Sequence, residues 1–465
     1  MIPSKPAELL KLTHRILRKD MIKSMNNIQQ ILDIFHKAEN RNTIPNHLYS
    51  EYKVKKGLRN ENGTGVVVGL TRICDVVGYT VDENGNKVDA PGELFYREFP
   101  LEALYNKVAA SDNNGYEEVC FLLLNGYLPS NQELKTFKDF LRSEYTLPEG
   151  YLSRNILRSP SINIMNKIQR SILLMFGEDE NPDDPSIDNT LRQGLSVIAK
   201  LPAICVYCYK AKAHILGNES LVIHPIRQDI DLAESFLYLL RGEGNYTQEE
   251  VSVLDLMMIL HADHGIGNNS TFASLVVSST QTDLYSSFAA AVGSLKGPRH
   301  GGANITCRNM MQTVIEDIGL DATYEQILDV IKKMLNKEYF DNSGLVYGMG
   351  HAVYTISDPR SLLLRQHAAE VARMKGYAKE LKFYQRFAEI ACGYIGKIKG
   401  KNICENVDFY SGFIYHMLEI PEDLFTPLFV ISRAIGWLAH ILEDKININR
   451  IVRPAGKFVG HYFND

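Results

Sequence analysis

Hydrophobic side chains recur at helical spacing along most of this chain, and that pattern predicts a mainly α-helical protein. A first helical stretch covers residues 5–40. Beyond residue 100, Gly or Pro usually separates the predicted helices. We expect them over 101–110, 115–125, 131–144, 164–177, 189–216, 229–242, 247–264, 271–296 (a pair), 302–318, 324–337, 361–375, 378–399 and 421–442.

Residues 66–81 depart from this pattern, because they are strongly strand-like. The polar run 82–86, Asp-Glu-Asn-Gly-Asn, has the composition of a turn and follows directly. A small β-hairpin is therefore expected near the N-terminus, as a minor addition to the helices.

The predicted helix 247–264 opens with a capping box, Thr247 to Glu250, and a glycine follows His264. His264 falls on the apolar stripe of this helix, so it is either a core histidine or a polar group at a ligand site. His261 and Asp263 could join it as metal ligands. Adjacent helical positions point in different directions, however, so this arrangement disfavours a metal.

Segment 348–360 carries the clearest chemical signal. It places His351 behind two glycines, Gly348 and Gly350, and Arg360 nine residues later. Glycine lets a backbone approach a ligand, histidine can move a proton near neutral pH, and arginine can grip a carboxylate with two hydrogen bonds. The segment predicts a site that reacts on a small anionic molecule.

Two further residues suit proton chemistry. His300 precedes the helix expected at 302–318, where the helix dipole disfavours imidazolium, so it either donates a hydrogen bond as a neutral ring or merely caps the helix. Asp408 is expected in a short, partly apolar loop, where it is either a base with a raised pKa or a turn residue.

Arg433 interrupts the otherwise apolar pattern of 428–442. A helix that is apolar all round is buried, and a buried guanidinium must find an anion, either a protein carboxylate or a substrate. Arg360 and Arg453 are two further candidates, and three arginines suit a ligand with more than one carboxylate.

The composition is that of an ordinary globular protein. The 465 residues are 45% hydrophobic and 23% charged, and the net charge is −5 without a basic stripe, so no nucleic-acid partner is expected. Seven cysteines without a framework fit a reducing compartment. We see no signal peptide and no transmembrane segment, and expect a cytoplasmic protein without a membrane partner.

Taken together, these motifs resemble the citrate synthase family over roughly residues 54–454. The resemblance is carried by the order and spacing of His261-Ala-Asp-His264, Gly297-Pro-Arg-His300-Gly-Gly-Ala-Asn304, Gly348-Met-Gly-His351, Asp358-Pro-Arg360, Asn406-Val-Asp408, Ser432-Arg433 and Arg453-Pro454.

The resemblance implies a two-domain fold with a large helical domain, 1–301 and 414–465, and a smaller one, 302–413. It also implies a homodimer. The expected reaction is citrate synthesis, in which acetyl-CoA condenses with oxaloacetate and citryl-CoA is hydrolysed to citrate and CoA. That makes the protein an acyltransferase of the tricarboxylic acid cycle, with acetyl-CoA as co-substrate, no tightly bound cofactor and no metal.

The resemblance also assigns roles to residues. Asp408 would remove a methyl proton from acetyl-CoA, His300 would hydrogen-bond the enol or enolate oxygen, and His351 would protonate the oxaloacetate carbonyl. Asn268 and Ser270 would support His300. Oxaloacetate would be held by His264, Arg360, Arg433 and, from the partner subunit, Arg453. The CoA would lie on the backbone near Leu345, Val346, Gly348 and Met349.

Two positions depart from the family pattern. Gly265 stands where an acidic residue often follows the histidine, and Thr355 stands where many members carry a basic residue near the CoA phosphates. Three alternatives stay open: a 2-methylcitrate synthase that uses propionyl-CoA, a metal-dependent hydrolase built on His261, Asp263 and His264, and a catalytically inactive relative kept for binding or assembly.

Overall fold

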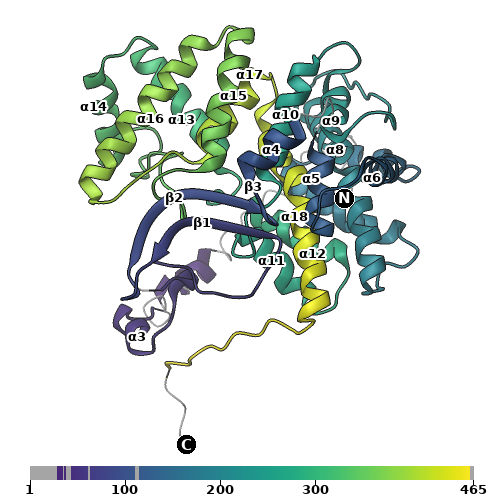
Figure 1. The fold of residues 1–465 in the computed structure, drawn as a ribbon, viewed down its shortest axis with the longest axis horizontal. Coiled ribbons are helices and arrows are strands. Elements are labelled where there is room, and N and C mark those ends of the chain that lie inside the picture. The colour runs from purple at the N-terminus through teal and green to yellow at the C-terminus, as the bar shows by residue number, and fades with distance from the viewer. Residues whose placement is uncertain (1–28, 35, 38–42, 61–62, 110–114, 461–465) are drawn as a thin grey trace, which may run out of the picture. The chain divides into compact units, whose positions relative to one another are not determined.

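The computed structural model describes residues 29–34, 36–37, 43–60, 63–109 and 115–460. The part of the chain that it describes is mainly α-helical, as predicted (Figure 1). Most of the helix expected over 5–40 lies outside the described residues, and the described ones, 29–34 and 36–37, are helical.

Within the described residues, most predicted helices are found within a few residues of their expected limits. They are α4 (Leu101–Ala109), α5 (Tyr116–Asn125), α6 (Asn131–Ser143), α7 (Ile164–Leu174), α8 (Ile187–Gly217), α9 (Leu232–Arg241), α10 (Gln248–His261), α11 (Asn269–Ser278), α12 (Leu284–Leu295), α13 (Ala303–Ile318), α14 (Tyr324–Leu335), α15 (Pro359–Lys375), α16 (Ala378–Lys399) and α18 (Phe425–Asn447). Two further helices were not predicted, α3 (Asn46–Glu51) and α17 (Val407–Met417).

The chain divides into two compact units. One comprises Met1–Glu61 with Ala455–Asp465, and the other Asn62–Pro454. In the first unit, the Lys457 ammonium lies 5.4 Å from the centroid of the Tyr52 ring. The second unit holds every candidate site residue. This division does not test the predicted boundaries at 301/302 and 413/414, which stay a prediction.

The expected β-hairpin is confirmed, although its first strand begins later than the pattern suggested. Strand β1 (Cys74–Val81) pairs antiparallel with β2 (Lys87–Tyr96), and the short β3 (Phe99–Pro100) continues the sheet (Figure 1). The turn closes on Asp82, whose Oδ1 accepts hydrogen bonds from the backbone N–H groups of Asn84 and Asn86. Polar turn chemistry therefore sets the hairpin, as the sequence indicated.

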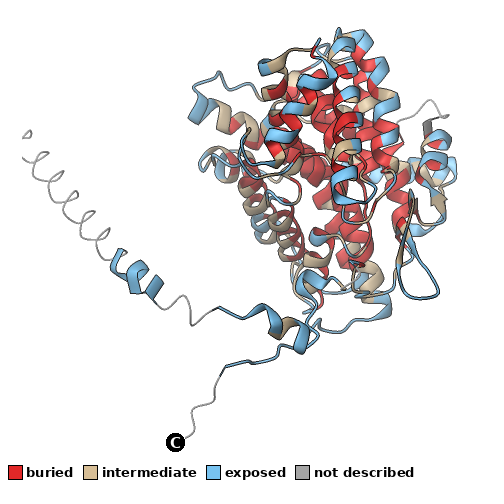
Figure 2. Cartoon of the chain, turned by 90° about the vertical axis from the view of Figure 1, so that its left-hand side faces the viewer, coloured by how far each residue is buried: buried red, intermediate tan, exposed pale blue. Residues whose placement is uncertain are grey.

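The core of the larger unit is built around α8 and α18, which pack directly on each other. Figure 2 shows that buried residues line the inward faces of the packed helices, while exposed residues lie on their outer faces. A Cβ atom at Gly194 of α8 would lie 2.3 Å from Leu438 Cδ1 of α18, so a larger residue there would force the Leu438 side chain to move. Both helices are long and apolar enough to cross a membrane. Yet 83% of the apolar window in Ile187–Gly217 and 100% of that in Glu422–Asn447 are buried inside the protein, as in core helices.

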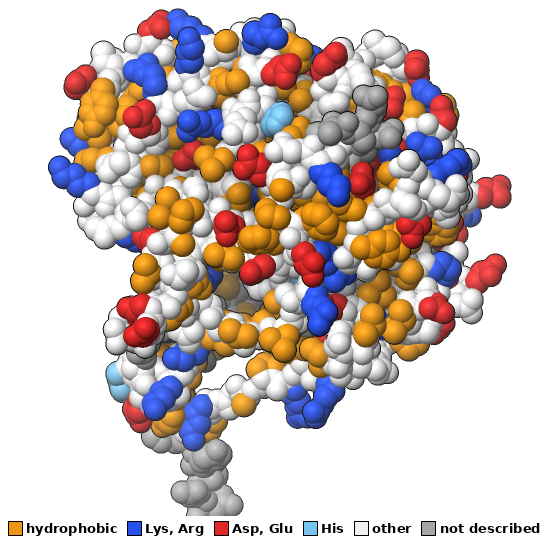
Figure 3. All heavy atoms as spheres, viewed as in Figure 1, with side chains coloured by type: hydrophobic (Ala, Val, Ile, Leu, Met, Phe, Trp, Pro, Cys, Tyr) orange, Lys and Arg blue, Asp and Glu red, His pale blue; other side chains and the backbone are white. Residues whose placement is uncertain are grey.

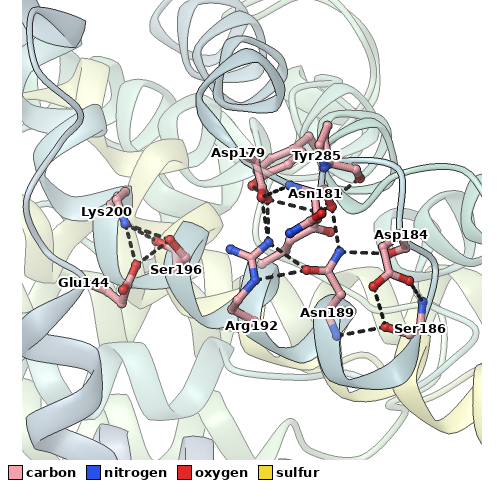
Figure 4. Close-up of polar contacts among 12 residues, drawn as sticks. Glu144, Asp179, Asn181, Asp184, Ser186, Asn189, Arg192, Ser196, Lys200 and Tyr285 are labelled. Atoms are coloured by element: carbon pink, nitrogen blue, oxygen red, sulfur yellow. Dashed lines mark hydrogen bonds and ion pairs between the residues drawn. The ribbon is translucent and has the colours of Figure 1, made fainter.

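A polar network secures the start of α8 (Figure 4). The Asp179 carboxylate accepts hydrogen bonds from Arg192 Nη2 at 2.7 Å and from the Tyr285 hydroxyl of α12 at 2.6 Å. Ser186 caps the helix by accepting a bond from the Asn189 backbone N–H. These bonds join the start of α8 to α12.

The visible surface mixes both signs of charge. On the face drawn in Figure 3, acidic and basic side chains alternate over the molecule and gather into no patch of one sign.

Candidate active site

The histidine turn after α10 forms the centre of the site. The predicted capping box opens α10, with Thr247 and Glu250 bonded reciprocally. The helix ends at His261, three residues before the predicted end, and His264 follows in a buried turn. Its ring centroid lies 5.2 Å from that of His351, and its Nε2 atom has no hydrogen-bond partner among the described residues.

Tyr96 of β2 explains why the helix ends early. Its hydroxyl lies 2.9 Å from the Ile259 carbonyl oxygen and 3.2 Å from that of Asp263, so it joins the last helical turn to the chain beyond it. Gly265 then turns the chain with φ +76°, a conformation that favours glycine. The sequence pattern located the glycine but could not reveal the distant tyrosine.

Segment 348–351 passes close to the rest of the site. Gly348 has φ +81°, and a Cβ atom there would lie 2.8 Å from Phe409 Cδ2 and 2.9 Å from Cys307 Sγ. The Asn406 backbone N–H donates to the Gly348 carbonyl, and its side-chain amide donates to that of Gly350. The histidine loop is thereby fixed against the residues that precede Asp408.

The His351 ring is held in one tautomer. Its Nδ1 atom accepts hydrogen bonds from the backbone N–H groups of Val353 and Tyr354, each at 3.1 Å. In the neutral ring the hydrogen is therefore on Nε2. The ring also stacks on Tyr354, with centroids 4.7 Å apart, so this histidine presents a donor from a fixed orientation.

Arg360 sits in the first turn of α15 and forms a buried, two-pronged pair with Asp358. The distances are 3.0 Å from Nε to Oδ1 and 2.7 Å from Nη2 to Oδ2. Asp358 also accepts a bond from the Val407 backbone N–H, at the start of α17. One buried carboxylate therefore connects Arg360 to the helix that carries Asp408.

The structure places Asp408 in the first turn of α17, so the predicted loop is wrong. The Asn406 side chain caps this helix by accepting a bond from the Asp408 backbone N–H. Burial raises the pKa of Asp408 to about 6, although the positive charge of Arg360 opposes the shift. A buried carboxylate with this pKa can accept a proton near neutral pH.

His300 lies in the turn before α13, as its position in the sequence indicated. Its Nε2 atom lies 3.2 Å from both Asn268 Oδ1 and Ser270 Oγ. Trp437 of α18 donates its ring N–H to Ser270 Oγ, and the Ser270 hydroxyl donates to Asn268 Oδ1 at 2.9 Å. Burial and the charge of Arg433 lower the pKa of His300 to about 4.

Arg433 is completely buried in α18, as predicted. Its Nε donates to the His261 carbonyl oxygen at 2.6 Å, and the guanidinium lies over the Phe429 ring, 4.9 Å from its centroid. Neither Nη atom has a hydrogen-bond partner within the described part of the chain. A buried guanidinium with two unsatisfied groups is suited to bind an anion.

These side chains act on one another electrostatically. Burial lowers the pKa of His264 well below its usual value, and the charges of Arg360 and Arg433 add to the shift. Ring contacts bring the predicted groups together. The His264 ring lies 5.2 Å from that of His351 and 5.5 Å from that of Tyr354, which the Arg360 guanidinium covers. His300 and Arg433 both contact the Phe429 ring, and Asp408 joins through its neighbour Val407, which bonds the Asp358 partner of Arg360.

Arg453 does not join this group within one chain. It lies exposed in the segment after α18, and the neighbouring Val452 backbone donates to Ser279 Oγ near the end of α11.

The segment predicted to bind CoA lies beside an open pocket. Leu345 is exposed and Val346 buried, while the Met349 sulfur lies 3.4 Å from Cys392 Sγ. Cys392 lines a cavity of about 830 Å³ with Lys87, Asp89, Gly393, Gly396, Lys397, Gly400, Lys401, Asn402 and Ile403. Its three lysines would attract an anionic ligand.

The alternative metal site finds little support in the geometry. The His261 Nδ1 atom bonds the Met257 carbonyl, and the Asp263 carboxylate bonds His440. No cluster of three potential ligands occurs among the described residues. Two of the three proposed ligands, His261 and Asp263, therefore already bond other groups of the protein, each through one side-chain atom.

Sequence reasoning missed several residues that shape the site. Asp358 could have been found, because an Asp before Pro at a helix start is a familiar N-cap pattern. Tyr96, Tyr354, Trp437 and His440 carry no local signal, since each acts through residues that are distant in sequence or through a ring contact.

Known proteins resemble this chain over most of its length. A family model described as "Citrate synthase, C-terminal domain" matches residues 59–455. The citrate synthase of Haloferax volcanii is 34% identical over 412 residues, which cover 88% of this chain and 96% of the relative. The 2-methylcitrate synthase of Shewanella oneidensis is 32% identical, covering 79% of this chain and 88% of the relative.

Solved structures agree. The citrate synthase of Thermoplasma acidophilum, in a ternary complex with carboxymethyl coenzyme A and oxaloacetate, superposes with a TM-score of 0.70 at 27% identity. The match covers 89% of this chain and 97% of that one. The citrate synthase of Pyrobaculum aerophilum gives the same TM-score at 28% identity, covering 86% and 92%.

The lowered histidine pKa values can be measured directly. We expect His300 to stay neutral from pH 8 down to about pH 5, because burial and the charge of Arg433 lower its pKa to about 4. NMR of protein with labelled imidazole nitrogens would follow the titration, with His300→Gln to assign the signal and the exposed His214 as a reference. A His300 ring that becomes charged between pH 6 and 7 would contradict this electrostatic picture.

Proposed function

The chain belongs to the citrate synthase family, transferases that condense acetyl-CoA with oxaloacetate, and we propose that Asp408, His300 and His351 carry out the reaction. The observation that carries this proposal is the gathering of His264, His300 and His351 with two buried arginines.

In the proposed mechanism, Asp408 takes the proton from the acetyl-CoA methyl group. Its pKa of about 6 leaves it ionised at pH 7 but basic enough to share a proton in the transition state. A thioester α-proton is too weakly acidic for a carboxylate acting alone, so a donor must stabilise the developing oxyanion. Neutral His300 is that donor, and losing such a group typically costs on the order of 10² to 10³ in rate.

His351 acts on the other substrate. Because backbone N–H groups donate to its Nδ1 atom, the neutral ring carries its hydrogen on Nε2, and this N–H would donate to the oxaloacetate carbonyl as the new carbon–carbon bond forms. Arg433 and Arg360 bind the carboxylates, and His264 lies between them as a further hydrogen-bonding group. Citryl-CoA is then hydrolysed to citrate and CoA, and no step needs a metal.

The CoA contacts remain a proposal. We assign them to the backbone near Leu345, Val346, Gly348 and Met349, next to the lysine-lined pocket. Thr355 donates its hydroxyl to the Gly78 carbonyl oxygen at 2.6 Å, so its side chain is committed to the hairpin. We propose that the lysines of this pocket take the place of the basic residue that many family members carry there.

Thiol release with oxaloacetate and a series of acyl-CoA esters tests the function. We expect acetyl-CoA to give the highest kcat/KM, with propionyl-CoA lower by about 10- to 200-fold, because one methylene in a pocket changes binding by about 1–3 kcal/mol. A preference for propionyl-CoA would identify a 2-methylcitrate synthase instead. No thiol release with any ester would contradict the function itself.

Asp408→Asn tests the proposed base. We expect kcat to fall by about 10²- to 10⁴-fold while oxaloacetate still binds, since the amide cannot accept the proton. In the wild-type enzyme, kcat should decline as pH falls below about 6, because protonation of Asp408 removes the base. The exposed Asp75→Asn is the control. An Asp408→Asn enzyme with near-normal kcat would refute the assignment.

We further propose a homodimer in which Arg453 reaches the partner's site. Apolar side chains flank it in an exposed segment: Ile446, Ile448 and Ile451 are 65%, 48% and 62% exposed. Burial against a second copy would remove this surface from water.

We also propose a cytoplasmic location. The seven cysteines are all unpaired, which supports a reducing compartment, and cell fractionation would check the location.

Mixed dimers test the shared site. Arg453→Ala and Asp408→Asn should each be nearly inactive alone. When equal amounts are unfolded and refolded together, half of the dimers are mixed, and each has one intact site, so activity should return to about a quarter of wild type. If Arg453 served its own chain, every mixed site would carry one lesion and no activity would return.

A further inference from the structure

Asp263 and Arg433 are buried near each other without forming the expected ion pair. Asp263 is the strongest opposite charge acting on the Arg433 guanidinium. Carboxylate and guanidinium groups inside proteins usually pair through two hydrogen bonds. Here Arg433 uses only its Nε atom, on the His261 carbonyl, and both Nη atoms lack a hydrogen-bond partner among the described residues.

His440 engages Asp263 instead. Its Nε2 atom lies 2.9 Å from Asp263 Oδ2, and both side chains are completely buried. The same oxygen accepts a bond from the Gly265 backbone N–H. On the other side of the ring, Nδ1 lies 3.4 Å from Thr71 Oγ1 and 3.9 Å from Glu443 Oε2. The ring therefore spans from Asp263 to the chain before β1.

Both competitors for Asp263 lie on α18. His440 follows Arg433 by seven residues, or two helical turns, so the two side chains emerge on the same face. Between them, a Cβ atom at Gly436 would lie 2.6 Å from Asp263 Oδ1. The carboxylate therefore packs directly against the helix backbone between the two residues, and its hydrogen bond goes to the histidine.

We propose that His440 is a positioning residue that holds Asp263 and thereby keeps both Nη atoms of Arg433 available for a carboxylate of oxaloacetate. Without this hydrogen bond, the buried carboxylate would turn to the nearest cation. Oxaloacetate would then have to displace an internal ion pair before it could bind. The proposal rests on the assignment of Arg433 to oxaloacetate.

A pair of variants separates this role from simple packing. His440→Phe fills the space of the ring but removes the donor. We expect KM for oxaloacetate to rise at least about tenfold, because the substrate must then break a buried ion pair between Asp263 and Arg433, which has a large free-energy cost. KM for acetyl-CoA should change little. Adding Asp263→Asn should bring KM for oxaloacetate back down, because a neutral amide does not pair with the guanidinium.

His440→Gln is the conservative control, because its amide N–H can reach the position of Nε2, and we expect KM close to wild type. If His440→Phe does not fold, His440→Leu replaces it in the same comparison. If the variants that combine a His440 substitution with Asp263→Asn fold, while the single His440 variants do not, this result would also support the proposal. The two sets differ only in the negative charge of Asp263.

Two results would overturn the proposal. One is that the double variant with Asp263→Asn keeps the raised KM for oxaloacetate, or that neither the double variants nor the single His440→Phe and His440→Leu variants fold. The other is an equal rise in KM for both substrates. These outcomes differ from failure of the assigned function, which wild-type enzyme without thiol release would show. They also differ from failure of the Arg433 assignment, which Arg433→Ala with unchanged KM would show.

Discussion

The site depends on one costly arrangement, a guanidinium buried in α18 with its hydrogen bonds only partly satisfied. Arg433 is held by the His261 carbonyl and by the face of Phe429, and both contacts leave its Nη atoms unbonded. A charge in this state is stable only where the surrounding fold fixes it, because removal from water is not offset by a protein partner. In the proposed function, a carboxylate of oxaloacetate would supply the missing bonds.

The same helix sets the electrostatics of its neighbours. Trp437, one turn after Arg433, bonds Ser270, which in turn contacts His300. Burial and the charge of Arg433 lower the pKa of His300, so the residue that we propose for oxaloacetate binding also helps to keep the nearby imidazole neutral. In this proposal, substrate binding and the protonation state of His300 depend on the same buried charge.

The β-hairpin braces the second half of the site. Its Gly78 carbonyl accepts a bond from Thr355, and its Gly92 N–H donates to Ser357, between His351 and Arg360. A Cβ atom at Gly92 would lie 2.0 Å from the Ser357 carbonyl oxygen, so the two backbones touch. Val76 of the same hairpin approaches Gly265 after the other histidine turn. A short sheet therefore holds both histidine loops.

Local patterns in the sequence predicted what depends on local physics. Helical spacing gave most of the helices, the capping box gave the start of α10, and an arginine in an apolar helix indicated a buried guanidinium. Local patterns failed where contacts between residues distant in sequence, or the geometry of a helix cap, determine where a helix begins or ends. Tyr96 ends α10 early, and the Asn406 cap places Asp408 inside a helix. The Asp263–His440 contact joins residues 177 positions apart, which no local spacing could reveal.

A crystal structure with oxaloacetate bound would test the central claim most directly. The account predicts a substrate carboxylate within hydrogen-bonding distance of both Arg433 Nη atoms, with Asp263 still bonded to His440. Oxaloacetate bound elsewhere, or Arg433 paired with a protein carboxylate while the substrate is present, would contradict it.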